Sequence, residues 1–344
     1  MIAAARIHRA AAACIFLPAA ATAFLLIFSC DSASAWGWRT HEMINRRAVE
    51  LLPEPAHAAW SPLAAQLAAH ANDADDRKNT SRLEPPLHFI DIDVYGAPPF
   101  DTVSHDRQVL EKEHGVDFVL KRGVLPWAVG ETYAEVVTAL RAGDWAFAGI
   151  RAADLGHYVA DAHQPLHCTK NFDGQLTGNK GVHLFFEATM LDRFLEESML
   201  AAPSSIPEIE GAPVDLCFRW ISEAYGGIDT ILAADHEARA LDSRLEDRYI
   251  ERLWQGSREV ATRQIGAAAQ DFAVLLQAAW IEAGSPAPST NAAQEVSADS
   301  TQSLAVWQER AARPKEPEDR LPIGLTLAGI ATGVFLVMFF VKPN

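Results

Sequence analysis

The sequence predicts an all-α protein, because apolar residues recur at helical spacing along most of the chain and strand-like alternation is nearly absent. The chain has 344 residues and 49% of them are hydrophobic, which is enough to build a large core. An alternating pattern is convincing only in the short run 88–94. We therefore expect one helical domain over residues 36–285, with its helices packed around a cluster of polar side chains.

Glycine and proline residues divide this domain into predicted helices. Thr40 is the expected N-cap of the first helix, and Pro53 ends it. Gly123, Pro126 and Gly143 separate the helices in the middle of the chain. The predicted helices cover residues 40–52, 56–71, 102–121, 131–142, 145–162, 181–200 and 243–283.

The N-terminal segment has the composition of a signal peptide. Arg6 and Arg9 precede an apolar run, and the sequence ASA at 33–35 is a small-residue pattern of the kind that a signal peptidase cuts. We therefore interpret residues 1–35 as a signal peptide. A first transmembrane helix and lipidation at Cys30 are the alternatives.

The C-terminal segment predicts a membrane anchor. Residues 286–320 are rich in Pro, Ser, Ala, Glu and Arg, which is typical of a flexible linker. Residues 321–341 are apolar and uncharged, and the run is long enough to cross a bilayer, which takes about 20 residues. With an exported N-terminus, the helical domain is expected outside the cytoplasmic membrane, in the periplasm if the organism is a Gram-negative bacterium.

Charge and cysteine content restrict the possible partners and cross-links. The net charge of −16 repels nucleic acid and anionic lipid at long range, although bound metal cations would reverse the sign locally. Cys168 and Cys217 remain after cleavage of the signal peptide. Export permits a disulfide between them, and two free buried thiols are the equal alternative. No protein partner can be inferred.

The most informative stretch is 155–187, which holds four of the twelve histidines. His157 with Asp161, and His183 with Glu187, are each four residues apart, so each pair lies on one face of a helix. Imidazole and carboxylate without thiolate are ligands suited to zinc. One such pair is common by chance, but two pairs around HYVADAHQPLH favour a metal site.

Three further segments offer candidate ligands. Cleavage before Trp36 would free its amine, which could then chelate a metal together with its carbonyl oxygen and the nearby His41. The acidic loop 71–78 contains several aspartates, and an acidic loop alone is usually a solvated turn. His88 begins an apolar run, where an unpaired imidazole is costly, so it must be hydrogen-bonded or bind a ligand.

Taken in chain order, five segments resemble those of one protein superfamily. They are WGWRTH, the acidic loop, LHFID, HYVADAHQPLH and GVHLFFE. In this order they resemble the trinuclear zinc phosphodiesterases, which include bacterial zinc-dependent phospholipases C and the single-strand-specific zinc nucleases of fungi and plants. The similarity covers residues 36 to about 200 and implies an all-α helical-bundle catalytic domain of that type.

The resemblance implies three zinc ions (Zn²⁺) per chain. It implies that Asp73, His88, His157 and Asp161 bind the first ion. It implies His167, His183 and Glu187 for the second ion. The third ion would be bound by Trp36, His41 and Asp161, with Asp161 bridging two ions. Asp73 is preferred over Asp75 because its spacing from His88 is similar to that in the superfamily. Asp73 would also orient or deprotonate the attacking water.

The resemblance further implies hydrolysis of a phosphodiester. Closely spaced zinc ions neutralise such a substrate and lower the pKa of water towards about 7, which yields an activated hydroxide. The HxxxE pair in GVHLFFE favours a phospholipase C acting on a phospholipid. HQPLH and HFID are similar to the nucleases, in which the aspartate matching Asp91 holds the base, so a nuclease or nucleotidase acting on single-stranded nucleic acid is the alternative. A membrane-tethered zinc-binding protein without activity is the second alternative.

Overall fold

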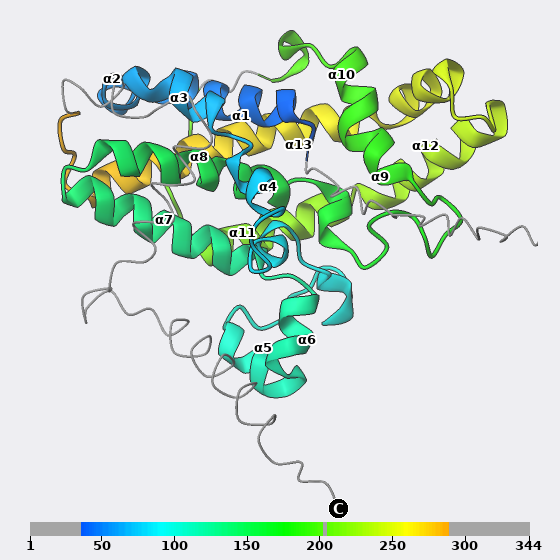
Figure 1. The fold of residues 1–344 in the computed structure, drawn as a ribbon, viewed down its shortest axis with the longest axis horizontal. Helices are drawn as coiled ribbons and strands as arrows, with labels where there is room; N and C mark the ends of the chain where they lie inside the picture. The colour runs from blue at the N-terminus through cyan, green and yellow to red at the C-terminus, as the bar shows by residue number, and fades with distance from the viewer. Residues whose placement is uncertain (1–35, 202–204, 289–344) are drawn as a thin grey trace, which may run out of the picture. The chain divides into compact units, whose positions relative to one another are not determined.

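The computed structural model describes residues 36–201 and 205–288, and the regular elements in this part of the chain are helices (Figure 1). The all-α prediction is therefore confirmed for these residues, which contain no strand. No described helix is long and apolar enough to cross a bilayer. The predicted signal peptide 1–35 and membrane segment 321–341 lie outside the described residues, as does the predicted linker from 289 onward. The domain boundaries stay predictions.

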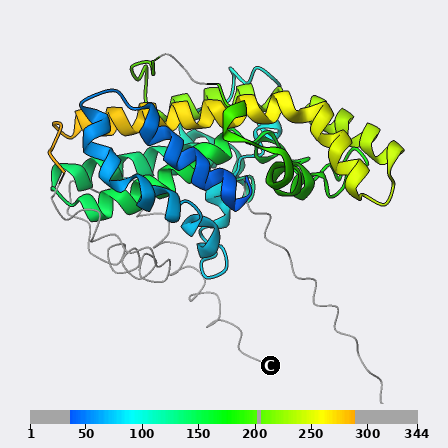
Figure 2. The same cartoon turned by 90° about the horizontal axis from the view of Figure 1, so that it is seen from above.

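Helix α8 (Trp145–Ala162) lies inside the domain and has almost no exposed face. Every residue from Ala148 to Ala162 is buried. The helix packs against α1 (Trp38–Leu51), α7 (Leu125–Arg141) and α13 (Asp247–Glu282), which Figures 1 and 2 show running past it. Polar side chains on α8 are therefore enclosed by protein and require partners.

Shorter helices surround this central group. Helix α12 (Ile228–Leu241) packs along α13, and α11 (Pro213–Tyr225) packs against α7. The other helices are α2 (Ala56–Trp60), α3 (Ala64–Ala69), α4 (Asp73–Arg77), α5 (Arg107–His114), α6 (Val116–Lys121), α9 (Val182–Leu184) and α10 (Met190–Phe194). The 3₁₀ and π turns are η1 (Ser61–Leu63), η2 (Pro85–His88), η3 (Ile92–Val94), η4 (Pro165–Cys168), η5 (Phe185–Thr189) and η6 (Glu197–Met199).

Glycine and proline explain most of the misplaced boundaries. Helix α7 begins at Leu125 rather than 131, because Pro126 occupies its first turn, where its missing N–H costs nothing. Gly37 occupies the N-cap of α1, so Thr40 lies within the helix and the N-cap prediction is wrong. Gly115, at φ 94°, divides the predicted helix 102–121 into α5 and α6.

Three helices and one alternating run differ from the prediction. Helix α4 lies within the segment 71–78, which the sequence predicts as an acidic loop. Helices α11 and α12 were not predicted, although α11 begins with proline and buries apolar residues at helical spacing. The alternating run 88–94 is not a strand but includes the 3₁₀ turn η3. The backbone of this run bonds elsewhere: the Ile90 N–H donates to the carbonyl of His167 at 2.9 Å.

Gly156 allows neighbouring helices to approach α8 closely. A Cβ atom there would lie 2.0 Å from Oδ1 of Asn45 on α1 and 2.6 Å from Cε1 of Phe272 on α13. The close contact brings His41 of α1 against His157, with ring centroids 4.0 Å apart and the rings stacked. Glycine at this position therefore helps to assemble the polar cluster.

The two cysteines of the described chain are free and buried in the hydrophobic core. Burial raises the pKa of both Cys168 and Cys217, so each is a neutral thiol at physiological pH. Of the two alternatives that the sequence left open, the structure has the free thiols.

Candidate metal centre

Three groups of histidine and carboxylate side chains meet around the C-terminal half of α8. Within each group the possible ligand atoms lie within 4.8 Å of one another, and all the residues are buried. The groups are His41, His157 and Asp161; Asp75, His88 and His157; and His167, His183 and Glu187.

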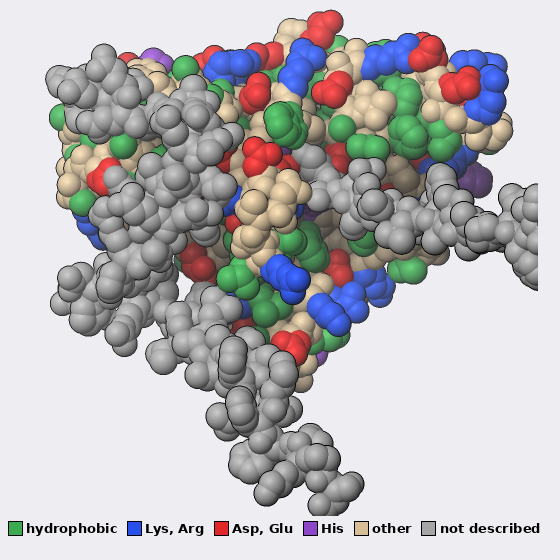
Figure 3. All heavy atoms as spheres, viewed as in Figure 1, with side chains coloured by type: hydrophobic (Ala, Val, Ile, Leu, Met, Phe, Trp, Pro, Cys, Tyr) green, Lys and Arg blue, Asp and Glu red, His purple; other side chains and the backbone are tan. Residues whose placement is uncertain are grey.

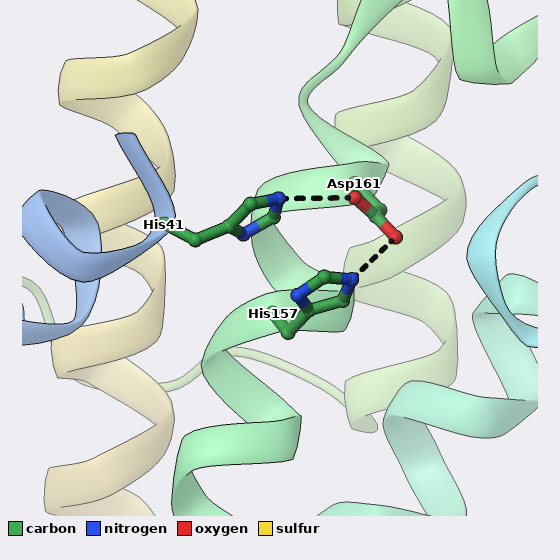
Figure 4. Close-up of side chains that lie close together, drawn as sticks. All are labelled: His41, His157 and Asp161. Carbon is green, nitrogen blue, oxygen red and sulfur yellow. Dashed lines mark ion pairs between the residues drawn. The ribbon is translucent and has the colours of Figure 1, made fainter. Parts of the chain in front are cut away.

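The first group joins α1 to α8. Figure 4 shows the carboxylate of Asp161 between two imidazoles, with Oδ1 3.7 Å from Nε2 of His41 and Oδ2 3.4 Å from Nε2 of His157. His157 and Asp161 point the same way because four residues advance a helix by about one turn. The carbonyl of Ala71 lies 2.7 Å from Nδ1 of His157 and leaves Nε2 facing the cluster.

The second group shares His157 and adds ligands from two further segments. Nδ1 of His88, in η2, lies 3.0 Å from Nε2 of His157 and 2.9 Å from Oδ2 of Asp161. Oδ1 of Asp75, on α4, lies 3.5 Å from Nδ1 of His88 and 3.4 Å from Nε2 of His157. A cation placed among these atoms would therefore have both imidazole and carboxylate ligands.

The third group lies where η4, α9 and the π turn η5 meet. Nε2 of His183 lies 2.8 Å from Oε2 of Glu187, and Nε2 of His167 lies 3.7 Å from the same oxygen. Nδ1 of His167 lies 2.7 Å from the carbonyl of His88 and 3.7 Å from Oδ1 of Asp161. The third group therefore adjoins the other two, and π turns of this kind often occur at functional sites.

The geometry favours Asp75, the alternative to the preferred Asp73, as the ligand from α4. Its Oδ2 lies 2.8 Å from Nδ1 of His70, and Asp73 belongs to none of the groups found among the described residues. Residues 73 and 75 are two positions apart on the five-residue helix α4, so their side chains leave opposite sides of it. Asp75 therefore lies at the cluster and Asp73 beside His70, while the choice of ligand and the catalytic role given to Asp73 stay predictions.

Trp36 lies beside the cluster, whereas Asp91 has a different partner. The indole N–H of the buried Trp36 donates to the carbonyl of Ala160 at 2.7 Å. The backbone N–H of Gly37 donates to the carbonyl of Glu187 at 2.9 Å. Asp91 accepts from Nη1 of Arg122 at 3.0 Å and belongs to none of the described groups. The ligand role of Trp36 and the base-binding role of Asp91 stay predictions.

The cluster fits a metal cation on the chemistry of its atoms. Both ring nitrogens of His41, Oδ1 of Asp161 and Oε1 of Glu187 are buried without a hydrogen-bond partner among the described residues. Each such atom costs about 1–3 kcal/mol when unpaired. A coordinated cation would satisfy them, and nitrogen and carboxylate ligands without thiolate suit zinc. The residues therefore fit zinc.

Neighbouring charges set the protonation of the cluster. Burial would lower the pKa of His157, but Asp161 and Asp75 outweigh it and raise the pKa to about 10. Burial, together with His157, lowers the pKa of His41 to about 3. A metal ion must displace the proton from His157, so zinc should bind more weakly as the pH falls.

Comparisons with known proteins do not assign this chain to a family. No protein-family model matches the sequence, and no curated protein matches it. Among solved structures, "Alpha Toxin from Clostridium Absonum" matches with a TM-score of 0.41 and 16% sequence identity. The match covers 71% of this chain and 65% of the toxin chain, so this chain spans slightly less than two thirds of the toxin's length.

Proposed function

We propose that this protein is a zinc-dependent phosphodiester hydrolase of the phospholipase C type, with up to three zinc ions. The observation that carries the proposal is the adjacency of the three buried ligand groups. The first two groups share His157, and Asp161 of the first group contacts His88 of the second and His167 of the third. When bound, closely spaced zinc ions neutralise a phosphodiester and activate water for attack on phosphorus.

The chain's own residues would bind and orient the substrate. Asp161 contacts histidines of all three groups, so it fixes their relative positions. The ammonium of Lys78 lies 2.5 Å from Oδ1 of Asp75 and adds a positive charge beside the second group. His167, His183 and Asp75 retain slight exposure, whereas His157 has none, so the substrate would enter from their side.

The loop 169–181, which joins η4 to α9 beside the third ligand group, favours phospholipid as the substrate. Phe172 is 47% exposed with its ring centroid 6.0 Å from that of His183, and Leu176 is 63% exposed. Lys170 and Lys180 on the same loop are also exposed. Apolar side chains accompanied by lysines are typical of segments that enter a lipid headgroup layer.

Local hydrogen bonds hold this loop in shape. Asp93 accepts from the Thr169 hydroxyl at 2.9 Å and from the Lys170 N–H at 3.0 Å. Oδ1 of Asn171 accepts from the Leu176 N–H at 2.8 Å. The exposed apolar side chains are therefore presented on an ordered loop, which reduces the entropy cost of binding.

Surface charge gives the nucleic-acid alternative less support. The chain carries a net charge of −16, and Figure 3 shows acidic, basic and hydrophobic side chains interspersed on the face seen in Figure 1. A nucleic-acid surface is usually a basic stripe or patch. An exposed aromatic ring such as Phe172 can also stack on a base, which keeps single-stranded nucleic acid as the second candidate substrate.

Replacing Phe172 and Leu176 together by serine should separate the substrates. We expect hydrolysis of phosphatidylcholine vesicles to fall about 10-fold or more, because burying each side chain in lipid contributes on the order of 1 kcal/mol or more. Hydrolysis of a soluble chromogenic phosphodiester should stay within about twofold, since the loop does not supply the ligands. Both rates and single-stranded DNA cleavage are measured on the same preparations.

The matched control is Leu241→Ser, which removes a 48% exposed leucine at the end of α12. It should leave all the rates unchanged. The protein would instead be identified as a nuclease by two results together. The wild type would cleave DNA but not hydrolyse vesicles, and the double variant would cleave DNA more slowly. Bound zinc without turnover of any substrate would identify a zinc-binding protein without activity.

The N-terminal residue provides a further test. A mature chain that begins at Trp36 should hold about one more zinc than one that begins Met-Trp36, since an amide nitrogen is a very poor zinc ligand. Most of the phosphodiester hydrolysis should be lost with that ion, while the other ligand groups keep theirs. Elemental analysis and rates are compared. Equal zinc content and equal rates would show that Trp36 only packs against α8.

The proposed location follows from the sequence. An exported domain anchored by residues 321–341 would place the catalytic centre outside the cytoplasmic membrane, beside its lipid substrate. Protease added outside the cell should then release a fragment by cutting within 289–320, while a reporter after Asn344 stays inside.

A further inference from the structure

We propose that Glu84 is a positioning residue that holds His88 for the metal, as part of a buried charge network that fixes all three segments carrying the second ligand group. The proposal rests on the metal centre proposed above. Glu84 is 3% exposed and lies four residues before His88. Nothing in the sequence marks it as part of the site.

Glu84 faces the side of the His88 ring that the cluster leaves free. Nδ1 of His88 points to Asp161, whereas Nε2 lies 3.5 Å from Oε1 of Glu84, which is an ion-pair distance, and Nε2 has no hydrogen-bond partner among the described residues. A carboxylate at the second nitrogen of a metal-binding histidine fixes the orientation and tautomer of the ring. With the proton on Nε2, the Nδ1 lone pair is directed at the metal position.

Glu84 is itself held from two sides. Nε of Arg77 donates to Oε2 at 3.1 Å, and Nη2 donates to Oε1 at 3.2 Å. The hydroxyl of Tyr158 donates to Oε1 as well. The carboxylate therefore cannot rotate away from His88 without breaking bonds to Arg77 or Tyr158.

The network continues from Arg77 into α8. Nη1 of Arg77 donates to Oδ1 of Asp154 at 2.9 Å, and Arg151 donates to the other oxygen of Asp154. Arg151 also donates to Oε2 of Glu135 at 2.6 Å, where the network reaches partial exposure. Buried ion pairs often contribute little net stability, so a network of this size indicates a role in holding geometry.

The positions of its members match the second ligand group. Arg77 follows Asp75 by two residues on α4, Glu84 precedes His88 by four, and Tyr158 directly follows His157 on α8. Each ligand of this group therefore has a network residue on its own segment. The third group takes a different support, since Gln164 donates to Glu187 at 3.2 Å. Loss of the network should affect the second group selectively.

The test is Glu84→Gln, which keeps the size of the side chain and removes its charge. We expect the zinc ion at the second group to bind about 10- to 100-fold more weakly, while the other zinc ions keep their affinity. The measurement is bound zinc against buffered free zinc, with melting of the metal-free protein followed in parallel. Glu84→Asp should partly restore the affinity, because the charge returns on a shorter side chain.

The matched control is Glu111→Gln, the same change at a partly buried glutamate of α5 that accepts from Nε of Arg107 at 2.7 Å and is not part of the network, and it should leave the zinc isotherm unchanged. If Glu84→Gln folds poorly, Tyr158→Phe takes its place. It keeps the charge of Glu84 and removes one hydrogen-bond donor, so it should weaken zinc binding at the second group by a smaller factor. An unchanged isotherm for Glu84→Gln, or equal weakening at every site, would overturn the proposal. Zinc binding without hydrolysis by the wild type would refute the activity alone, and the isotherms would still decide the role of Glu84.

Discussion

Replacing Asp161 by asparagine should reduce phosphodiester hydrolysis by at least about 1000-fold, which corresponds to roughly 4 kcal/mol of transition-state stabilisation. Oδ2 lies 2.9 Å from Nδ1 of His88, and Oδ1 lies 3.7 Å from both His41 and His167. Asp161 therefore contacts all three ligand groups. Its amide analogue carries no charge to neutralise a cation, and its nitrogen is a poor ligand.

The expected result includes metal content as well as rate. Elemental analysis should show that Asp161→Asn loses the zinc ions of the first and second groups. The matched control is Asp235→Asn on α12, another fully buried carboxylate, which accepts from Tyr249 and from Nε of Arg239 at 2.6 Å. That variant should lose stability but keep its zinc. If Asp161→Asn retained both zinc and activity, the proposed centre would be wrong.

Replacing Asp75 and Asp73 separately by asparagine should give opposite results. Asp75→Asn should lose the zinc ion of the second group and about 100-fold or more of the hydrolysis rate, since it removes a ligand carboxylate. Asp73→Asn should keep the rate within about threefold. It should lower the free energy of unfolding by about 1–3 kcal/mol, because it weakens the buried contact with His70.

Each of these two variants serves as the control for the other. Both change an aspartate of the five-residue helix α4, and both side chains are buried to a similar degree. Rate, zinc content and chemical denaturation are measured for each. A larger loss of rate in Asp73→Asn than in Asp75→Asn would restore the assignment made from spacing along the chain.

Much of the site could be predicted because its ligands obey local rules. The i,i+4 spacing predicted that His157 and Asp161 share a face of α8, and the structure places them so. The choice between Asp73 and Asp75 could not be made, because spacing alone does not give the rotation of a helix as short as α4. Only the packed structure shows which aspartate faces His88.

The charge network around Glu84 was missed for a different reason. Its partners lie far apart in sequence: Arg77 and Asp154 are separated by 77 residues, so no local periodicity connects them. One signal was present. Arg151 and Asp154 are charged residues three apart in a stretch rich in alanine, and such charges must find partners if the helix is buried.

The crowding at Gly156 determines how this centre could be re-engineered for another metal. An added Cβ there would collide with Asn45 and Phe272, so α8 packs closely against α1 and α13 next to His157. Ligands on α8 are therefore unsuitable targets for redesign. The short segment that carries His183 lies outside the network around Glu84, and libraries directed at it should change metal selectivity while the central helix keeps its place.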